Sequence, residues 1–125
     1  MSLVVFSELM RHAEKNSYAV GYFESWNMES LFAVSDAAEH ARSPVILGFS
    51  GIYLPHPGRA VTEHLSDYAA LAFEVGSRLS VPCCLLFNES ADLAWVYEAV
   101  DLGFHMVMFT DETLSLREQT ETVKA

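Results

Sequence analysis

The sequence predicts an α/β protein built on a parallel sheet. Two observations support this fold class: four apolar runs have the length of buried strands, and stretches with helical spacing of apolar residues separate them. Strands that alternate with helices in this way form parallel sheets with right-handed crossovers. Because no linker or low-complexity segment interrupts the pattern, we expect residues 1–125 to form a single domain.

The expected elements follow in order along the chain. The strands are predicted near 18–23, 45–49, 81–87 and 104–109, and the helices near 3–15, 27–42, 61–79, 90–102 and from 115 onward. Asn27 and Ser90 are expected to cap the helices that they precede, and Gly103 to end a helix in the left-handed conformation. Ser115 with Glu118 three residues later predicts a capping box for the last helix.

Composition excludes several classes of function. The 125 residues include 17 acidic and 7 basic side chains, for a net charge of −10, which argues against nucleic acid or an anionic membrane as partner. No apolar run approaches the roughly 20 residues of a membrane span, and no secretory signal is recognisable, so a cytoplasmic protein is expected. Cys83 and Cys84 are neighbours in a strand and point to opposite faces, which predicts reduced core residues.

The pattern alone leaves two architectures open. The spacing of the strands suits either a doubly wound open sheet or part of a barrel. Neither the G-x-G-x-x-G nor the G-x-x-x-x-G-K-S/T phosphate-binding motif is present, which removes support for the common nucleotide-binding open sheets. A complete eight-stranded barrel typically needs about 250 residues, twice the length of this chain.

A resemblance favours the barrel. Four segments in order carry it: YAVGYFESWNMESL, ARSPVILGFSG, SVPCCLLFNES and DLGFHMVMFTDETLSLRE. Together they are similar to the N-terminal half of the class II, metal-dependent fructose-bisphosphate and tagatose-bisphosphate aldolases. The resemblance implies half of a TIM (β/α)₈ barrel, with four parallel strands in sequential order and helices on the outer face. It also implies a lyase that cleaves a phosphorylated sugar with a divalent metal, usually zinc, which stabilises an enediolate.

The chain departs from the family at its reacting groups. In the family's LDH motif an aspartate transfers the proton and a histidine binds the metal, and the matching residues here are Asn88 and Glu89. An amide cannot transfer a proton as a carboxylic acid does, whereas Glu89 offers an oxygen ligand that favours harder cations. The family's asparagine after the first strand is matched by Glu24. Its residues after the fourth strand fall on Thr110 and Glu112.

The residues themselves also point to the strand ends. Glu24, Glu89, Asp111 and Glu112 follow buried strands, and Ser50 leaves the second one. In a barrel these groups would converge on one rim, where such folds keep their chemistry. Combined with this convergence, the resemblance implies Glu89, with Glu112, as metal ligands, Asn88 at the position of the family's catalytic acid, and Glu24 and Ser50 as substrate contacts. The alternative is that the acids stabilise the positive ends of the following helices.

Two residues of the longest loop are further candidates. His56 lies among Pro55, Pro57 and Gly58, and it could bind a ligand or a substrate, although an exposed loop histidine is the simpler interpretation. Arg59 could bind a phosphate or be an ordinary surface residue. His105 precedes the last strand and is expected on the opposite rim from the chemistry.

Three functions from different classes remain compatible with the sequence. The first is a class II aldolase-like lyase, inactive as this isolated half, because the family's other ligands and its phosphate site lie beyond residue 125. The second is a non-catalytic half-barrel that associates with itself or with a partner. The third is a divergent metal-dependent enzyme for another phosphosugar. We expect unpaired first and fourth strands and an exposed apolar concave face, so that a missing C-terminal half or a second copy is needed.

Overall fold

Four parallel strands form one sheet in sequential order. The computed structural model describes residues 2–124, in which neighbouring strands pair in the order β1-β2-β3-β4. The bounds are β1 Gly21–Ser25, β2 Val45–Ser50, β3 Cys83–Ser90 and β4 Met106–Phe109. The order confirms the predicted half-barrel topology, because a doubly wound sheet would reverse its strand order. β1 and β4 are the two edges.

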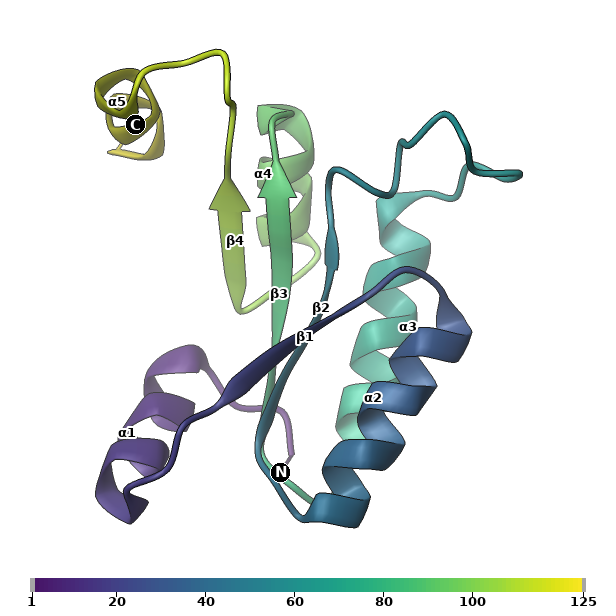
Figure 1. Ribbon diagram of the computed structural model, residues 1–125, viewed down its shortest axis with the longest axis vertical. Coiled ribbons are helices and arrows are strands. Elements are labelled where there is room, and N and C mark those ends of the chain that lie inside the picture. Colours follow the sequence, from purple (N-terminus) through teal and green to yellow (C-terminus); the bar gives the residue numbers. More distant parts are fainter. Residues whose placement is uncertain (1, 125) are drawn as a thin grey trace.

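Helices cover the two faces of the sheet unequally. The five helices of the described chain are α1 Phe6–Asn16, α2 Met28–Ala41, α3 Leu65–Arg78, α4 Leu93–Asp101 and α5 Leu116–Lys124. Figure 1 shows α2, α3 and α4 along one side of the strands, α1 on its own near the start of the sheet, and α5 beyond the carboxyl end of β4. None of these helices combines the length and apolar character that a bilayer crossing requires.

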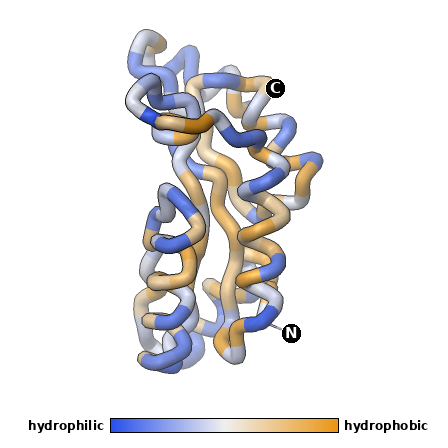
Figure 2. Tube along the Cα trace, turned by 90° about the vertical axis from the view of Figure 1, so that its right-hand side faces the viewer, coloured by the Kyte–Doolittle hydropathy of each residue, from blue (hydrophilic) through white to orange (hydrophobic). Residues whose placement is uncertain are grey.

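The main core lies between the sheet and α2, α3 and α4. Alternate side chains of β2 and β3 point into it, and Phe49 and Phe87 are fully buried there. Phe49 meets the ring of Tyr68 from α3 edge-to-face, with ring centroids 4.6 Å apart. In Figure 2 the central strands form an orange, hydrophobic band between helices that carry blue, hydrophilic residues. This core fixes the strands whose ends carry the candidate site.

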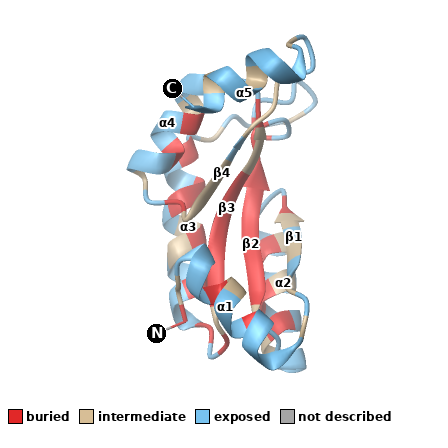
Figure 3. Ribbon diagram, turned by 90° about the vertical axis from the view of Figure 1, so that its left-hand side faces the viewer, coloured by how far each residue is buried: buried red, intermediate tan, exposed pale blue. Residues whose placement is uncertain are grey.

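The opposite, concave face is partly covered, contrary to expectation. Leu9 of α1 is fully buried against Ile46, Cys84 and Leu86, and Figure 3 shows α1 in front of the lower part of the sheet. The start of the chain is held there by backbone hydrogen bonds: the Cys83 N–H donates to the Ser2 carbonyl (2.7 Å) and the Val4 N–H to the Cys83 carbonyl (2.9 Å). The chain therefore closes the amino end of its own half-barrel and leaves the carboxyl end open.

Most of the expected helix ends are confirmed. The side chain of Asn27 accepts from the Ser30 N–H at 2.8 Å, Gly103 adopts a φ of +93°, and Ser115 and Glu118 exchange hydrogen bonds. The expectation for Ser90 is wrong, because Asp92 caps α4 by accepting from the Ala94 N–H at 2.8 Å. Ser90 instead ends β3, which runs further than its apolar residues because the pairing with β4 shifts register between Phe87 and Ser90.

Candidate functional site

Glu24 and Asn88 meet at the carboxyl end of the sheet. The Asn88 side chain donates from Nδ2 to Oε2 of Glu24 at 3.1 Å, although the two residues lie on strands that do not pair with each other. β2 lies between these two strands, and its Gly48 pairs with Glu24 on one side and with Leu86, two residues before Asn88, on the other. A glycine here leaves the inner face of β2 without a side chain, so that groups from β1 and β3 reach one another.

Tyr22 completes this cluster. Its hydroxyl donates to the same oxygen, Oε2 of Glu24, at 3.1 Å, since residues two apart on a strand share a face. Burial raises the pKa of the Tyr22 phenol far above its usual value, and the carboxylates of Glu24 and then Glu89 raise it further. The phenol therefore stays protonated and remains a hydrogen-bond donor. The sequence reasoning missed Tyr22, although its position two residues before Glu24 could have indicated it.

Glu89 lies beside this cluster in a strained backbone conformation. Its φ is +49°, in the left-handed region that side chains other than glycine and asparagine rarely adopt, and it falls in the irregular stretch of β3. Its carboxylate is close enough to contribute to the pKa shift of Tyr22. The half-buried Asn88 and Glu89 thus project from a strand end whose geometry differs from regular pairing.

The other expected site residues do not join the cluster through direct contacts. Ser50 is buried, and its hydroxyl accepts from the Ile52 N–H at 3.2 Å, which shapes the turn after β2. The Asp111 carboxylate binds Thr113, whose hydrogen bonds lower the pKa of the Asp111 carboxyl, and Glu112 is exposed. Within residues 2–124, no three His, Cys, Asp or Glu side chains come close enough together to hold a metal ion.

A shallow pocket lies in the loops that follow β1 and β2, and the sequence analysis did not predict that its residues come together. Trp26 and Tyr53 form a tilted aromatic pair with ring centroids 6.0 Å apart, beside His56 and Arg59. The Arg59 guanidinium donates to the Trp26 carbonyl at 3.1 Å and to both oxygens of Glu63 at 2.8 and 2.9 Å. Arg59 therefore ties the loop after β2 to the loop after β1, and its charge is already balanced.

His105 and the two cysteines lie outside the candidate site. His105 stands at the start of β4, and its Nδ1 accepts from the Leu85 N–H at 2.9 Å, while burial lowers the pKa of its imidazole. Cys83 and Cys84 are free and buried, in the two different cores on either side of the sheet. Burial raises their thiol pKa values to about 12 and about 11, so both thiols stay protonated at neutral pH.

The contact between Glu24 and Asn88 predicts how a second negative charge at residue 88 changes the stability of the chain. Asn88→Asp keeps the shape but puts a second carboxylate against Glu24, and we expect it to lower the free energy of unfolding by about 1–3 kcal/mol at pH 7. Adding Glu24→Gln restores one amide facing one carboxylate and should recover the loss. Urea unfolding of both single variants and the double variant measures the coupling. A double variant no more stable than Asn88→Asp would contradict the contact.

Comparisons with known proteins agree with this geometry. The family model described as fructose-bisphosphate aldolase class-II matches residues 4–125. The chain is 34% identical over 127 residues to a fructose-bisphosphate aldolase from Thermus caldophilus, covering 98% of this chain and 39% of that protein. It is 27% identical over 124 residues to a sulfofructosephosphate aldolase from Alkalicoccus urumqiensis, covering 99% of this chain and 41% of that protein. The chain thus spans less than half of either relative.

A solved structure gives the same result for the fold. The crystal structure of the YdjI aldolase from Escherichia coli K12 superposes with a TM-score of 0.75 at 23% sequence identity, and the match covers 93% of this chain and 43% of that one. The superposition therefore covers most of this chain and less than half of the longer one. With a family model that covers almost every residue, the conclusion is direct: the chain belongs to the class II fructose-bisphosphate aldolase family.

Proposed function

We propose that this chain supplies the first half of an aldolase-type active site, which is completed by groups outside it, for a phosphorylated sugar. The observation that carries the proposal is the hydrogen bond between Glu24 and Asn88 at the carboxyl end of the sheet. Groups at this end of a barrel's strands carry the chemistry in enzymes of this fold. A lyase of this family is the function class that the sequence similarity supports.

The roles that we propose for Asn88, Glu24 and Tyr22 differ from the family pattern. Asn88 occupies the place of the family's proton-transferring aspartate, and its amide orients the carboxylate of Glu24. Glu24 is therefore the group of this pair that can hold a proton. In this chain the ionisable group stands on the first strand, whereas the family has it on the third. Tyr22, kept protonated by burial and by its acidic neighbours, donates to the same carboxylate and fixes its direction.

A divalent metal fits these residues only in part. Glu89 and Glu24 offer carboxylate oxygens, which suit hard cations such as Mg²⁺ or Mn²⁺ better than Zn²⁺. Since no group of three ligating side chains is present in residues 2–124, further ligands must come from outside them. When bound, such an ion would stabilise the negative charge that develops on the substrate during aldol cleavage. Glu89 is the residue we propose as its ligand, with Glu112 as a more distant candidate.

Metal titration tests the role of Glu89. We expect weak binding of Mn²⁺, Mg²⁺ or Zn²⁺ by the chain, and we expect Glu89→Gln to weaken it about tenfold or more, equivalent to about 1.4 kcal/mol. The reason is that an amide oxygen lacks the charge of the carboxylate. Isothermal titration calorimetry measures both affinities, and Glu14→Gln, an exposed site on α1, is the matched control. Equal affinities for Glu89→Gln and the unchanged chain would remove Glu89 from the site.

A further inference from the structure

An aromatic pocket lies in the loops that follow β1 and β2. It is lined by Trp26, Tyr53, His56, Gly58 and Arg59, and its volume is about 310 Å³, at the lower end of the range of about 300–1,000 Å³ that small-molecule sites occupy. Trp26 is 56% exposed and Tyr53 is 45% exposed. Exposed apolar patches with polar groups around them often mark ligand-binding sites.

The main chain of the two loops holds the aromatic pocket in shape. The Trp26 N–H donates to Oγ of Ser30 at 2.9 Å, and the Trp26 carbonyl accepts from the Arg59 guanidinium at 3.1 Å. The Tyr53 carbonyl accepts from the His56 N–H at 3.2 Å. Because these bonds use the main chain of both aromatic residues, they leave the two rings available to a ligand. A site that is already formed loses little conformational entropy when a ligand binds.

Neutral hydrogen-bond donors accompany the two rings. Nδ1 of His56 accepts from the Gly58 N–H at 3.0 Å. A ring nitrogen that accepts carries no hydrogen, so the neutral imidazole holds its hydrogen on Nε2 and has it left to donate. The indole N–H of Trp26 and the hydroxyl of Tyr53 have no hydrogen-bond partner within residues 2–124. The pocket therefore offers three neutral polar groups beside two aromatic faces.

The pocket has no free charge to bind an ion. The Arg59 guanidinium donates to both carboxylate oxygens of Glu63, at 2.8 and 2.9 Å, which balances the charge of the pair. An anion would find no unpaired cation, and the net charge of −10 would repel it. A ligand with an ammonium group would need a carboxylate, and the five lining residues include none. These charges favour an uncharged ligand.

The angle between the rings favours a puckered ligand over a flat one. The ring planes of Trp26 and Tyr53 are inclined at 53°, with centroids 6.0 Å apart. A flat base can stack on one of two tilted faces, but not on both. A sugar ring carries C–H groups on both of its sides, and these pack against the negatively polarised faces of aromatic rings. Its hydroxyl oxygens can accept from the indole N–H and from Nε2 of His56.

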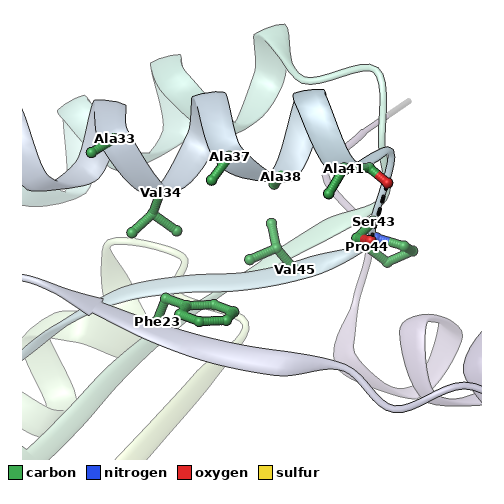
Figure 4. Close-up of a pocket in the computed structure, with 9 residues that line it drawn as sticks. All are labelled: Phe23, Ala33, Val34, Ala37, Ala38, Ala41, Ser43, Pro44 and Val45. Atoms are coloured by element: carbon green, nitrogen blue, oxygen red, sulfur yellow. Dashed lines mark hydrogen bonds between the residues drawn. The ribbon is translucent and has the colours of Figure 1, made fainter.

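The apolar groove beside α2 lacks this combination of groups. Its volume is about 440 Å³, and Figure 4 shows Phe23 of β1 on one side of it and the alanines of α2 on the other. Its one polar side chain is Ser43, whose hydroxyl donates to the Ala41 carbonyl at 3.3 Å. Of these two recesses, the aromatic pocket is the one that pairs aromatic faces with available donors.

We propose that the aromatic pocket binds an uncharged sugar ring at a site separate from the proposed active site. Glu24 contacts Asn88 on the concave side of the sheet, which it shares with Tyr22. Arg59, by contrast, donates to the hydroxyl of Tyr68, a residue of the core on the helix side. The proposal does not rest on aldolase chemistry, so either proposal can fail without the other.

Tryptophan fluorescence tests whether a sugar binds in this pocket. Trp95→Phe leaves Trp26 as the single tryptophan of the chain. Titration with D-glucose and with D-galactose should change its emission in a saturable way, with a dissociation constant in the millimolar range that suits so small a ligand. Adenosine is the flat comparison ligand and D-glucose 6-phosphate is the anionic one. No saturable change with either sugar, or tighter binding of either comparison ligand, would overturn the proposal.

Variants then locate the bound sugar. Trp26→Ala and Tyr53→Ala should each weaken sugar binding at least tenfold in isothermal titration calorimetry, because each removes one aromatic face. Tyr97→Ala, at a 59% exposed tyrosine of α4, is the matched control and should bind as the unchanged chain does. Glu24→Gln alters the proposed active site and should also leave the sugar affinity unchanged. Circular dichroism checks that each variant is folded.

Two results of this series would contradict the proposal. Sugar affinity that survives both Trp26→Ala and Tyr53→Ala would place the sugar outside the aromatic pocket. Sugar affinity that falls with Glu24→Gln as much as with Trp26→Ala would place the sugar at the proposed active site. Neither result would remove the family assignment or the role of Glu89, which the metal titration tests.

Discussion

The 125-residue chain is expected to show no measurable aldol cleavage of a ketose bisphosphate, with or without added zinc. Two independent losses lead to this result. The amide of Asn88 cannot transfer a proton, and a general acid typically contributes a factor of about 10² to 10⁴. The carboxylate that contacts Asn88 belongs to Glu24, on the first strand and not the third, and a displacement of a reacting group by about 1 Å can already cost about 10²-fold.

The second loss is the metal site. The described residues bring no three ligating side chains together, so an ion would be held weakly and would stabilise little charge on the substrate. A coupled assay of triose phosphate release measures cleavage, with a full-length class II aldolase as the positive control and Asn88→Asp as the variant that restores a carboxyl group. Robust cleavage by the unchanged chain would show that our interpretation of Asn88 is wrong.

Gly48→Ala should lower the free energy of unfolding by about 3 kcal/mol. A Cβ at Gly48 would lie 1.9 Å from the carbonyl oxygen of Leu86, which belongs to the backbone of the adjacent strand and cannot turn aside as a side chain can. β2 and β3 would have to separate at the centre of the sheet. The contact between Glu24 and Asn88 spans this position, so the variant should disturb the site as well as the stability.

Gly58→Ala is the control for that measurement. Gly58 lies in the exposed loop, and an added Cβ would meet only the side chain of His56, at 3.1 Å, so a change within about 0.5 kcal/mol is expected. Urea unfolding at one protein concentration compares the two variants, because association also stabilises the folded chain. Equal stabilities for Gly48→Ala and the unchanged chain would contradict the close approach of the strands.

Sequence reasoning located the strand ends but not their contacts. The exit of the third strand at Asn88 and Glu89 followed from an apolar run that stops abruptly, and this signal is local. The hydrogen bond from Asn88 to Glu24 depends on the register of two strand pairs and on the absence of a side chain at Gly48. No periodicity within either segment reveals that register, so the two residues were expected on one rim but not in contact.

The errors have similar physical causes. Ser90 was expected to cap α4 because serine is a common cap, but the shifted pairing of β3 and β4 keeps Ser90 in the strand and passes the role to Asp92. The helix predicted from residue 61 begins at Leu65, where the His64 N–H donates to the Asp67 carboxylate at 3.2 Å and fixes the start of the helix. The cover that α1 gives to the concave face depends on contacts between residues from about 40 to about 80 positions apart, which local sequence patterns do not reveal.

The attachment of Ser2 and Val4 to Cys83 has a consequence for how the chain folds during its synthesis. Their hydrogen-bonding partner, Cys83, is synthesised about 80 residues after them, which takes several seconds at about 5–20 residues per second. Until β3 has been synthesised, α1 cannot pack against it, and Leu9 and Ile46 stay exposed to solvent. During this interval the apolar inner face of the growing sheet stays exposed to solvent, where it can take part in non-native contacts.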